Sequence, residues 1–136
     1  MNLQYNLQPT SFVSNISCLN GLTVNGTLST TGNLYTNLPI ILSQSPLTYT
    51  FSLSDKGKLY GSIGSVVYIP NDNTTNFEIG TQIAIAQFST TILTISAEQN
   101  VIVRSTENRR NLRTQNSMAV IIKINPNDWF LFGDLL

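Results

Sequence analysis

The carboxylates are the residues most able to do chemistry, and they are few. Seven occur, all in the last 82 positions: Asp55, Asp72, Glu78, Glu98, Glu107, Asp128 and Asp134. Hydrolysis of a glycosidic bond needs two carboxylates about 5 to 10 Å apart in a cleft. The sequence leaves that geometry open, yet a small β module with polar loops rarely provides a deep cleft. We therefore predict that the protein is not an enzyme and has no catalytic residues.

The sequence contains no His and only one Cys, which excludes most other kinds of catalytic and metal site. Without His, Ser-His-Asp and Cys-His catalysis and imidazole metal ligands are excluded. Cys18 alone makes no internal disulfide or zinc cluster, and we expect it to be a small buried residue. Asp72, with Asn71 and Asn73, could offer oxygens to calcium, but the acidic density is low and a turn is predicted instead. No metal and no cofactor are expected.

Basic side chains gather in one short segment. Four of the seven basic residues fall within ten positions, opposed there only by Glu107: Arg104, Arg109, Arg110 and Arg113. One interpretation is a basic contact loop for an acidic protein surface or an anionic glycan. The favoured one is a solvated loop between two strands. Because the formal net charge is zero and only 10% of residues are charged, we expect no nucleic-acid partner. No apolar stretch is long enough for a membrane helix, so no membrane partner is expected.

The first 54 residues carry no charge, whereas all fourteen charged residues lie in the rest of the chain. A boundary is predicted near residues 44–50, giving an N-terminal arm over 1–45 and a β module over 46–136. The arm has apolar positions to bury: Leu19, Leu22, Val24, Leu28, Leu34 and Leu38. An exposed neutral strand edge is a template for pairing. We therefore predict an arm that contacts another subunit or a larger scaffold, in preference to a poorly ordered polar leader.

Short β-branched and aromatic runs recur along the rest of the chain. They predict strands over 49–53, 65–69, 82–88, 91–97, 101–103, 119–124 and 129–132. In the run over 119–124, alternation puts Val120, Ile122 and Ile124 on one face. No window keeps a helical stripe, and only 108–117 could hold a helical turn. The predicted fold is all-β, a small β-sandwich or barrel with an extended N-terminal arm of strands and turns. The aromatics assigned to its core are Phe51, Phe88, Trp129, Phe130 and Phe132.

Four sequence pieces occur in the order of a known β module. They are YTFSLSDKGKLY, VVYIPNDNTTNFEIGTQIAIAQF, ISAEQNVIVRS and LRTQNSMAVIIKINPNDWFLFGDL. Over residues 47–135 the chain thus resembles a module of the structural proteins of tailed phages, cyanophages among them. The most specific part is the ending, in which a lysine strand leads to Asn-Asp-Trp and then Gly-Asp-Leu. The arm segment GLTVNGTLSTTGNL is similar to the strand-turn spacers of phage fibres and decoration proteins.

This resemblance implies a virion structural protein, commonly a trimer. Fibre subunits that carry the module tend to be far longer, and this short chain has no shaft. The expected function is therefore that of a capsid decoration (cement) protein. It would assemble in the host cytoplasm, bind the major capsid protein on the outer head surface as a homotrimer, and stabilise the shell. The alternative is a tail- or head-fibre tip that recognises a host surface glycan through Tyr60, Tyr68 and the loop over 71–76.

Overall fold

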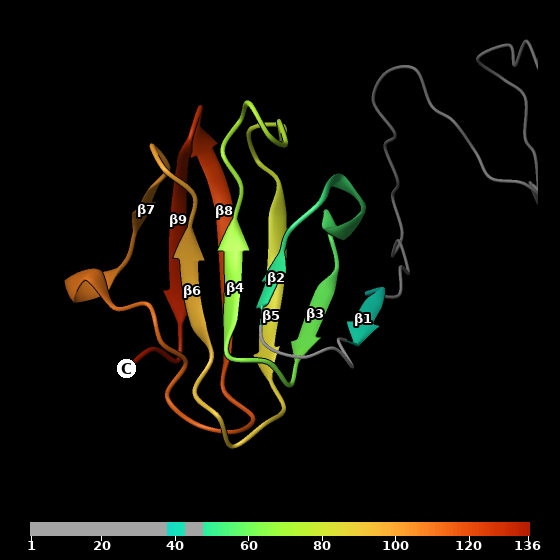
Figure 1. The fold of residues 1–136 in the computed structure, drawn as a ribbon, viewed down its shortest axis with the longest axis vertical. Coiled ribbons are helices and arrows are strands. Elements are labelled where there is room, and N and C mark those ends of the chain that lie inside the picture. The colour runs from blue at the N-terminus through green and yellow to red at the C-terminus, as the bar shows by residue number, and fades with distance from the viewer. Residues whose placement is uncertain (1–37, 43–47) are drawn as a thin grey trace, which may run out of the picture. The chain divides into compact units, whose positions relative to one another are not determined.

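Strands make up nearly all of the regular structure in this computed structural model, which describes residues 38–42 and 48–136 (Figure 1). The strands are β1 (Ile40–Leu42), β2 (Thr48–Thr50), β3 (Leu59–Ser62), β4 (Val66–Ile69), β5 (Gln82–Gln87), β6 (Thr94–Ala97), β7 (Ile102–Arg104), β8 (Met118–Asn125) and β9 (Asp128–Gly133). Two short 3-10 turns join them, η1 (Leu53–Asp55) and η2 (Thr106–Asn108). The prediction of an all-β fold is confirmed.

The strands form two sheets, and the chain alternates between them. The larger sheet has six strands in the order β1-β3-β5-β8-β9-β7, and the smaller has three in the order β2-β4-β6. From β1 to β7 each successive strand joins the other sheet, so β1, β3 and β5 are parallel, as are β2, β4 and β6. Strand β8 then pairs antiparallel with β5, and β9 pairs antiparallel with β8 and parallel with β7, so the β8–β9 hairpin separates β5 from β7.

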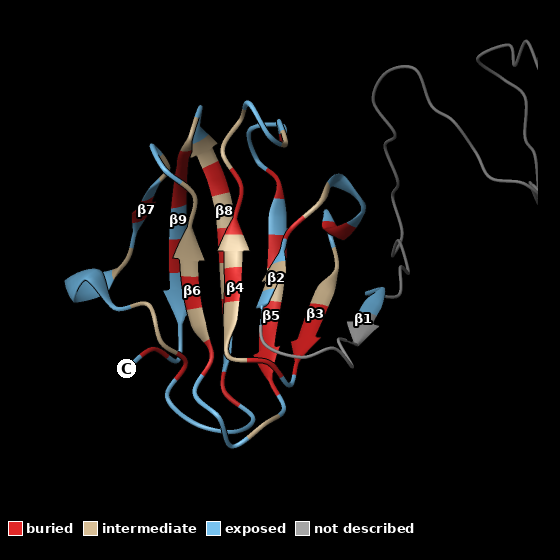
Figure 2. Ribbon diagram, in the orientation of Figure 1, coloured by how far each residue is buried: buried red, intermediate tan, exposed pale blue. Residues whose placement is uncertain are grey.

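One apolar core takes side chains from both sheets. Ile83 and Ile85 of β5 are fully buried in it, together with Val67 of β4 and Ile95 of β6. Along β8, buried positions alternate with more exposed ones, and the same alternation holds over residues 82–85 of β5 and 129–132 of β9 (Figure 2). Each of these three strands therefore has one face toward the core and one face away from it.

The aromatic residues assigned to the core divide into two groups. Phe51 and Trp129 are buried as predicted, at 1% and 0% exposure. The assignment is wrong for Phe88, Phe130 and Phe132, which are 40%, 45% and 46% exposed. In β9, Trp129 occupies a core position, so the period of two turns Phe130 and Phe132 to the opposite face.

Phe88 is exposed for a different reason, because it lies one residue past the end of β5. Its ring covers Gly61 of β3, where an added Cβ would come 2.2 Å from the ring. Conversely, Tyr60 is only 1% exposed and stacks on Tyr49 with ring centroids 4.6 Å apart. Tyr60 is thus part of the core, and its expected part in glycan binding is wrong.

Most predicted strands match observed ones within a few residues, with four differences, at β1, η1, β3 and η2. The run over 49–53 does not continue as a strand, because the Asp55 side chain accepts hydrogen bonds from the Ser52 amide (2.7 Å) and the Tyr49 hydroxyl (2.9 Å) and folds η1. Strand β1 and strand β3, which contains Gly61, are not among the predicted strands. The helical turn allowed within 108–117 occurs just upstream, as η2.

Candidate interaction surface

The face of the six-stranded sheet that points away from the core is apolar, and we call it the outer face. Strand register aligns one row of side chains across five strands: Ile40, Leu59, Ala84, Val120 and Phe132. A second row runs through Gly61, Ala86 and Met118, with Phe88 over the glycine. A third runs through Gln82, Ile122, Phe130 and Arg104. These three adjacent rows of the outer face hold a single charged residue, Arg104 at one end, and beyond them the face continues with the register pair of Ile102 and Asp128.

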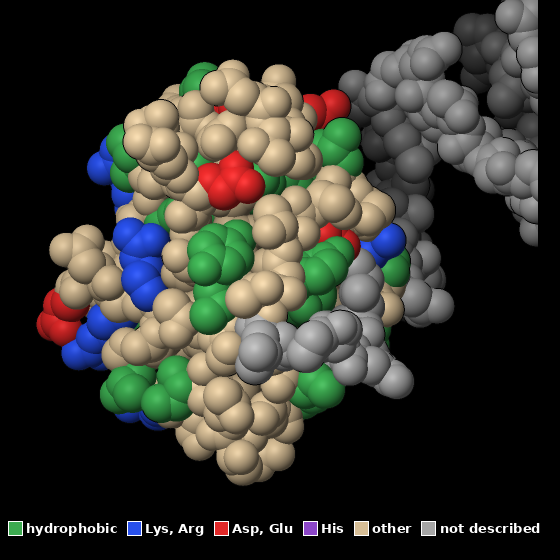
Figure 3. Space-filling view, viewed as in Figure 1, with side chains coloured by type: hydrophobic (Ala, Val, Ile, Leu, Met, Phe, Trp, Pro, Cys, Tyr) green, Lys and Arg blue, Asp and Glu red, His purple; other side chains and the backbone are tan. Residues whose placement is uncertain are grey.

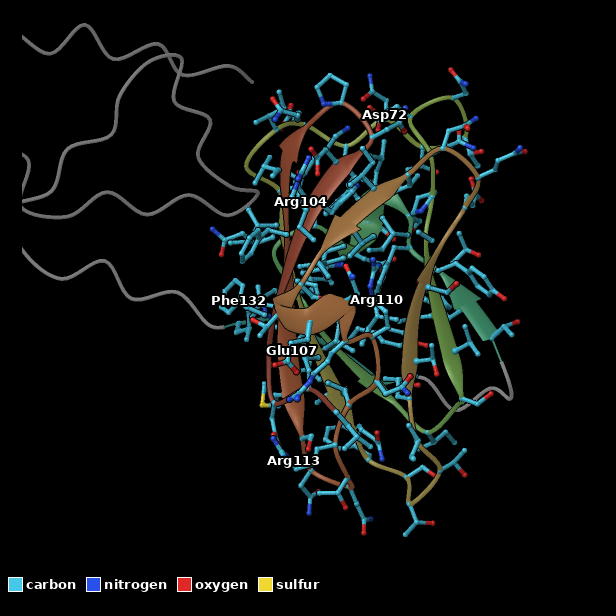
Figure 4. The ribbon with its side chains drawn as sticks, turned by 90° about the vertical axis from the view of Figure 1, so that its left-hand side faces the viewer. Asp72, Arg104, Glu107, Arg110, Arg113 and Phe132 are labelled. Carbon is cyan, nitrogen blue, oxygen red and sulfur yellow. The ribbon has the colours of Figure 1, made fainter. Side chains whose placement is uncertain are left out.

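Large apolar side chains on the outer face are exposed. Those at least 40% exposed are Leu38, Ile40, Phe88, Ile102, Met118, Phe130 and Phe132. Phe130 and Phe132 lie side by side with ring centroids 6.4 Å apart, and Figure 4 shows Phe132 pointing away from the core. Contiguous apolar patches on monomeric proteins rarely exceed a few hundred Å², and larger ones mark interaction sites. The outer face is therefore the candidate interaction surface among the described residues.

The face also includes the point where the described chain begins. Leu38 lines a shallow depression with Ala84 and Val120, in the middle of the sheet, and with Gly57, Lys58 and Gln82 at its rim. Leu38 itself is 55% exposed. Of the arm residues predicted to make contacts, Leu38 alone is described. Cys18, Leu19, Leu22, Val24, Leu28 and Leu34 lie outside the described residues.

Acidic residues from the end of the chain neutralise the predicted basic loop. Arg104 binds Asp128 in a bidentate pair, with Nε–Oδ1 at 2.9 Å and Nη2–Oδ2 at 2.8 Å. This hydrogen bonding raises the pKa of Arg104. Arg113 pairs with Asp134 at 2.5 Å. Glu107 is the only carboxylate within the segment itself, but β9 and the residues after it bring two more carboxylates alongside.

The other two arginines of the predicted loop contribute little free charge. Arg109 pairs with Glu107 at 2.5 Å. Arg110 donates to the carbonyl oxygen of Val103, and burial lowers its pKa. Figure 3 shows basic and acidic side chains next to each other on this side of the domain. The four arginines face three carboxylates, so the segment does not form a concentrated positive patch.

A buried lysine lies at the other end of β8. Lys123 is 2% exposed and occupies the core face of its strand, next in alternation after Ala119 and Ile121. Its Nζ donates to Asp72 Oδ1 and to the Phe77 carbonyl oxygen, both at 2.6 Å, and to Asn76 Oδ1 at 3.3 Å. Every ammonium hydrogen thus has an acceptor, as a buried charge requires. Lys123 is not among the site residues predicted from the sequence, although its alternation with Ala119 and Ile121 is a signal that could have identified it.

The carboxylate of Asp72 connects this lysine to the turn between β8 and β9. Its Oδ2 accepts from the Asn127 amide at 2.9 Å, and the Asp72 amide donates to Asn127 Oδ1 at 2.8 Å. The preceding residue folds the predicted turn, because Asn71 Oδ1 accepts from the amides of Asn73 and Thr74 at 2.9 and 3.0 Å. This polar cluster therefore fastens the loop over 71–77 to the end of the larger sheet.

The described residues hold no metal-binding group, since nowhere in 38–42 or 48–136 do three or more His, Cys, Asp or Glu side chains meet in a way that could hold an ion. Across these same ranges there is no helix with the length and apolar character needed to cross a membrane. Among the described residues, the candidate site is therefore the outer face, a surface of exposed apolar side chains.

Comparisons with known proteins give no relative for this chain. No protein-family model, no curated protein and no solved structure matches it. The resemblance to the phage module therefore remains a prediction from the sequence.

Proposed function

We propose that the protein is a virion structural protein, a capsid decoration protein that binds the outer head surface as a homotrimer and stabilises the shell. The resemblance of residues 47–135 to the phage module supports a role in a phage particle. The observation that carries the proposal is the outer face, a broad apolar surface with its large side chains exposed. A surface of this kind suits a subunit whose work is to hold other protein subunits.

The proposed mechanism is stabilisation by binding. A protein that binds the assembled shell and not its loose subunits stabilises the shell by mass action. A trimer offers three equivalent contacts, and each contact raises the effective concentration of the next. A closed three-fold oligomer also presents the same patch to each surrounding capsid subunit. In this arrangement the uncharged arm over 1–45 would contact the shell or a neighbouring subunit.

A second candidate is the tip of a tail or head fibre that recognises a host glycan. The feature in its favour is Tyr68 of β4, which is partly exposed on the face of the smaller sheet away from the core. Its register neighbours there are Thr50 and Ser96. An amphipathic ring between hydroxyl side chains can stack on a sugar while the hydroxyls accept and donate hydrogen bonds.

Immunogold labelling of purified particles separates the two candidates. Antibodies against residues 48–136 should label the whole head surface of a decorated capsid. Labelling confined to the tail, or to one vertex, would overturn the decoration proposal and support the fibre tip.

A further inference from the structure

We propose that the outer face is the surface through which copies of this chain bind one another. This inference rests on the proposed function, because it names the surface that would build the homotrimer. The occupant of the face is a second copy of the chain, whose own outer face turns toward the same symmetry axis.

The outer face is large enough to contribute to two contacts. Its first row crosses five strands, and strands are about 4.8 Å apart. Rows on one face are roughly 6.7 Å apart along a strand, so three rows cover on the order of 400 Å². A standard interface buries about 800 Å² per partner, of which about 56 to 65% is apolar. Because each face in a trimer contacts two neighbours, it supplies about 200 Å² to each contact, a little under half of the expected apolar area, and the rest must come from other parts of the chain.

The near absence of charge on the outer face favours a copy of this neutral chain over a strongly acidic or basic partner. The three rows hold one charged side chain, Arg104, and its charge is met within the same chain by Asp128. The whole protein has a formal net charge of zero. A strongly acidic or basic partner would find no complementary charge on this face. Two copies meet without repulsion, and each offers the other an equally uncharged surface.

Symmetry explains how a flat sheet face serves three copies. Three sheets placed around a three-fold axis can all turn their outer faces inward, so that each face contacts both neighbours. Phe130 and Phe132 are the largest exposed side chains of β9, and Met118 lies on the adjacent strand. Exposed aromatic side chains of this size are typical anchors of an interface. They would meet their counterparts near the axis.

The test is the oligomeric state of the full chain when these anchors are shortened. We would measure mass by light scattering after size exclusion for the wild type and the double variant Phe130→Ser/Phe132→Ser. The matched control is Leu53→Ser/Ile79→Ser, which shortens two side chains of similar exposure, 58% and 64%, outside the outer face. The fluorescence of buried Trp129 reports whether each variant folds.

We expect the wild type and the control to elute as trimers of about 45 kDa, three times the chain mass of 15.0 kDa. The Phe130→Ser/Phe132→Ser variant should be a folded monomer, with self-association weakened at least about 100-fold. If the Phe130→Ser/Phe132→Ser variant fails to fold, the variant Met118→Lys is used in its place, because it puts a charge at an exposed position of the outer face. It should dissociate the trimer to the same extent.

Three results would overturn the inference. One is a wild type that remains monomeric at tens of micromolar. Another is a folded outer-face variant that remains trimeric. The third is an oligomer lost on deletion of residues 1–37 but kept in both outer-face variants, since the arm would then be the contact. None of these would decide whether the protein decorates a capsid, which the labelling experiment tests separately. A dimer that both outer-face variants dissolve would support the contact surface and overturn the three-fold arrangement.

Discussion

Replacing Lys123 with Met tests whether the buried lysine fastens the loop over 71–77 to the larger sheet. Methionine keeps much of the length of the side chain but donates no hydrogen bonds. Asp72 would lose the ammonium group that pairs with it, and the Phe77 carbonyl would lose its 2.6 Å donor. Removing one member of a buried ion pair costs about 3 to 5 kcal/mol. Because the Asp72 side chain is still 17% exposed, we expect the lower end, about 3 kcal/mol.

Urea unfolding followed by the fluorescence of Trp129, the only tryptophan, measures this cost. With a slope of about 2 kcal/mol per molar for a domain of this size, the midpoint should fall by roughly 1.5 M. The matched control is Lys56→Met, which removes an exposed lysine from its pair with Glu78. Exposed pairs contribute about 0 to 1 kcal/mol, so its midpoint should hardly move.

A double variant measures the coupling between Lys123 and Asp72. When Asp72 is also changed to Asn, no unpaired carboxylate remains, so Lys123→Met/Asp72→Asn should lose less than the sum of the two single variants. The account of the lysine would be refuted if Lys123→Met lowered the midpoint no more than Lys56→Met did. Strict additivity of the two changes would also refute it.

Three further changes test other parts of the structure. Burial and the Asp55 carboxylate raise the pKa of Tyr49 from 10.0 to about 12. Its contribution to stability is therefore present below pH 10 and lost as the pH rises toward 12. When melting temperatures are measured over this pH range, Tyr49→Phe should lack the fall that the wild type shows. Hydrogen bonds from Arg113 and then Ser117 lower the pKa of Asp134 below 3.8, so its contribution is present above that pH and lost below it. Asp134→Asn should therefore flatten the dependence of melting temperature on pH below about pH 4. If the melting temperature of the variant fell with acid as steeply as that of the wild type, the pairing of Asp134 with Arg113 would be refuted. Gly133→Ala should destabilise the fold by about 3 kcal/mol or more in urea unfolding, because a Cβ there would lie 2.5 Å from backbone atoms of β8 and the residue has φ +147.

The all-β fold and most strand positions follow from local alternation, which is why they could be predicted. Alternation alone does not say which face of a strand is buried. In β8 the apolar set of Val120, Ile122 and Ile124 is the more hydrophobic one, yet the core side holds Ala119, Ile121 and Lys123. The lysine can take a core position because Asp72 and the loop after it, some 50 residues away in sequence, supply its acceptors.

The same ambiguity hid the candidate surface. Both sides of β9 are aromatic, with Trp129 on one and Phe130 and Phe132 on the other, so composition assigned all three to the core. Only the pairing of β8 with β9 shows that the two phenylalanines share a face with Val120 and Ile122. Composition therefore identifies these residues as important but does not give their side of the sheet.

A cluster of like charges in the sequence does not show which opposite charges the fold brings next to it. The arginines over 104–113 are close together in the chain, whereas Asp128 and Asp134 approach them only through the placement of β9 beside β7 and the return of the C-terminal residues. Local counting therefore overstates the positive charge of the segment.

Densitometry of a denaturing gel of purified particles, calibrated against the major capsid protein, tests the central claim most directly. The proposed decoration function predicts a ratio near one copy of this chain per capsid subunit. A ratio corresponding to only a few copies per particle would contradict it and would place the chain at the tail or at a unique vertex.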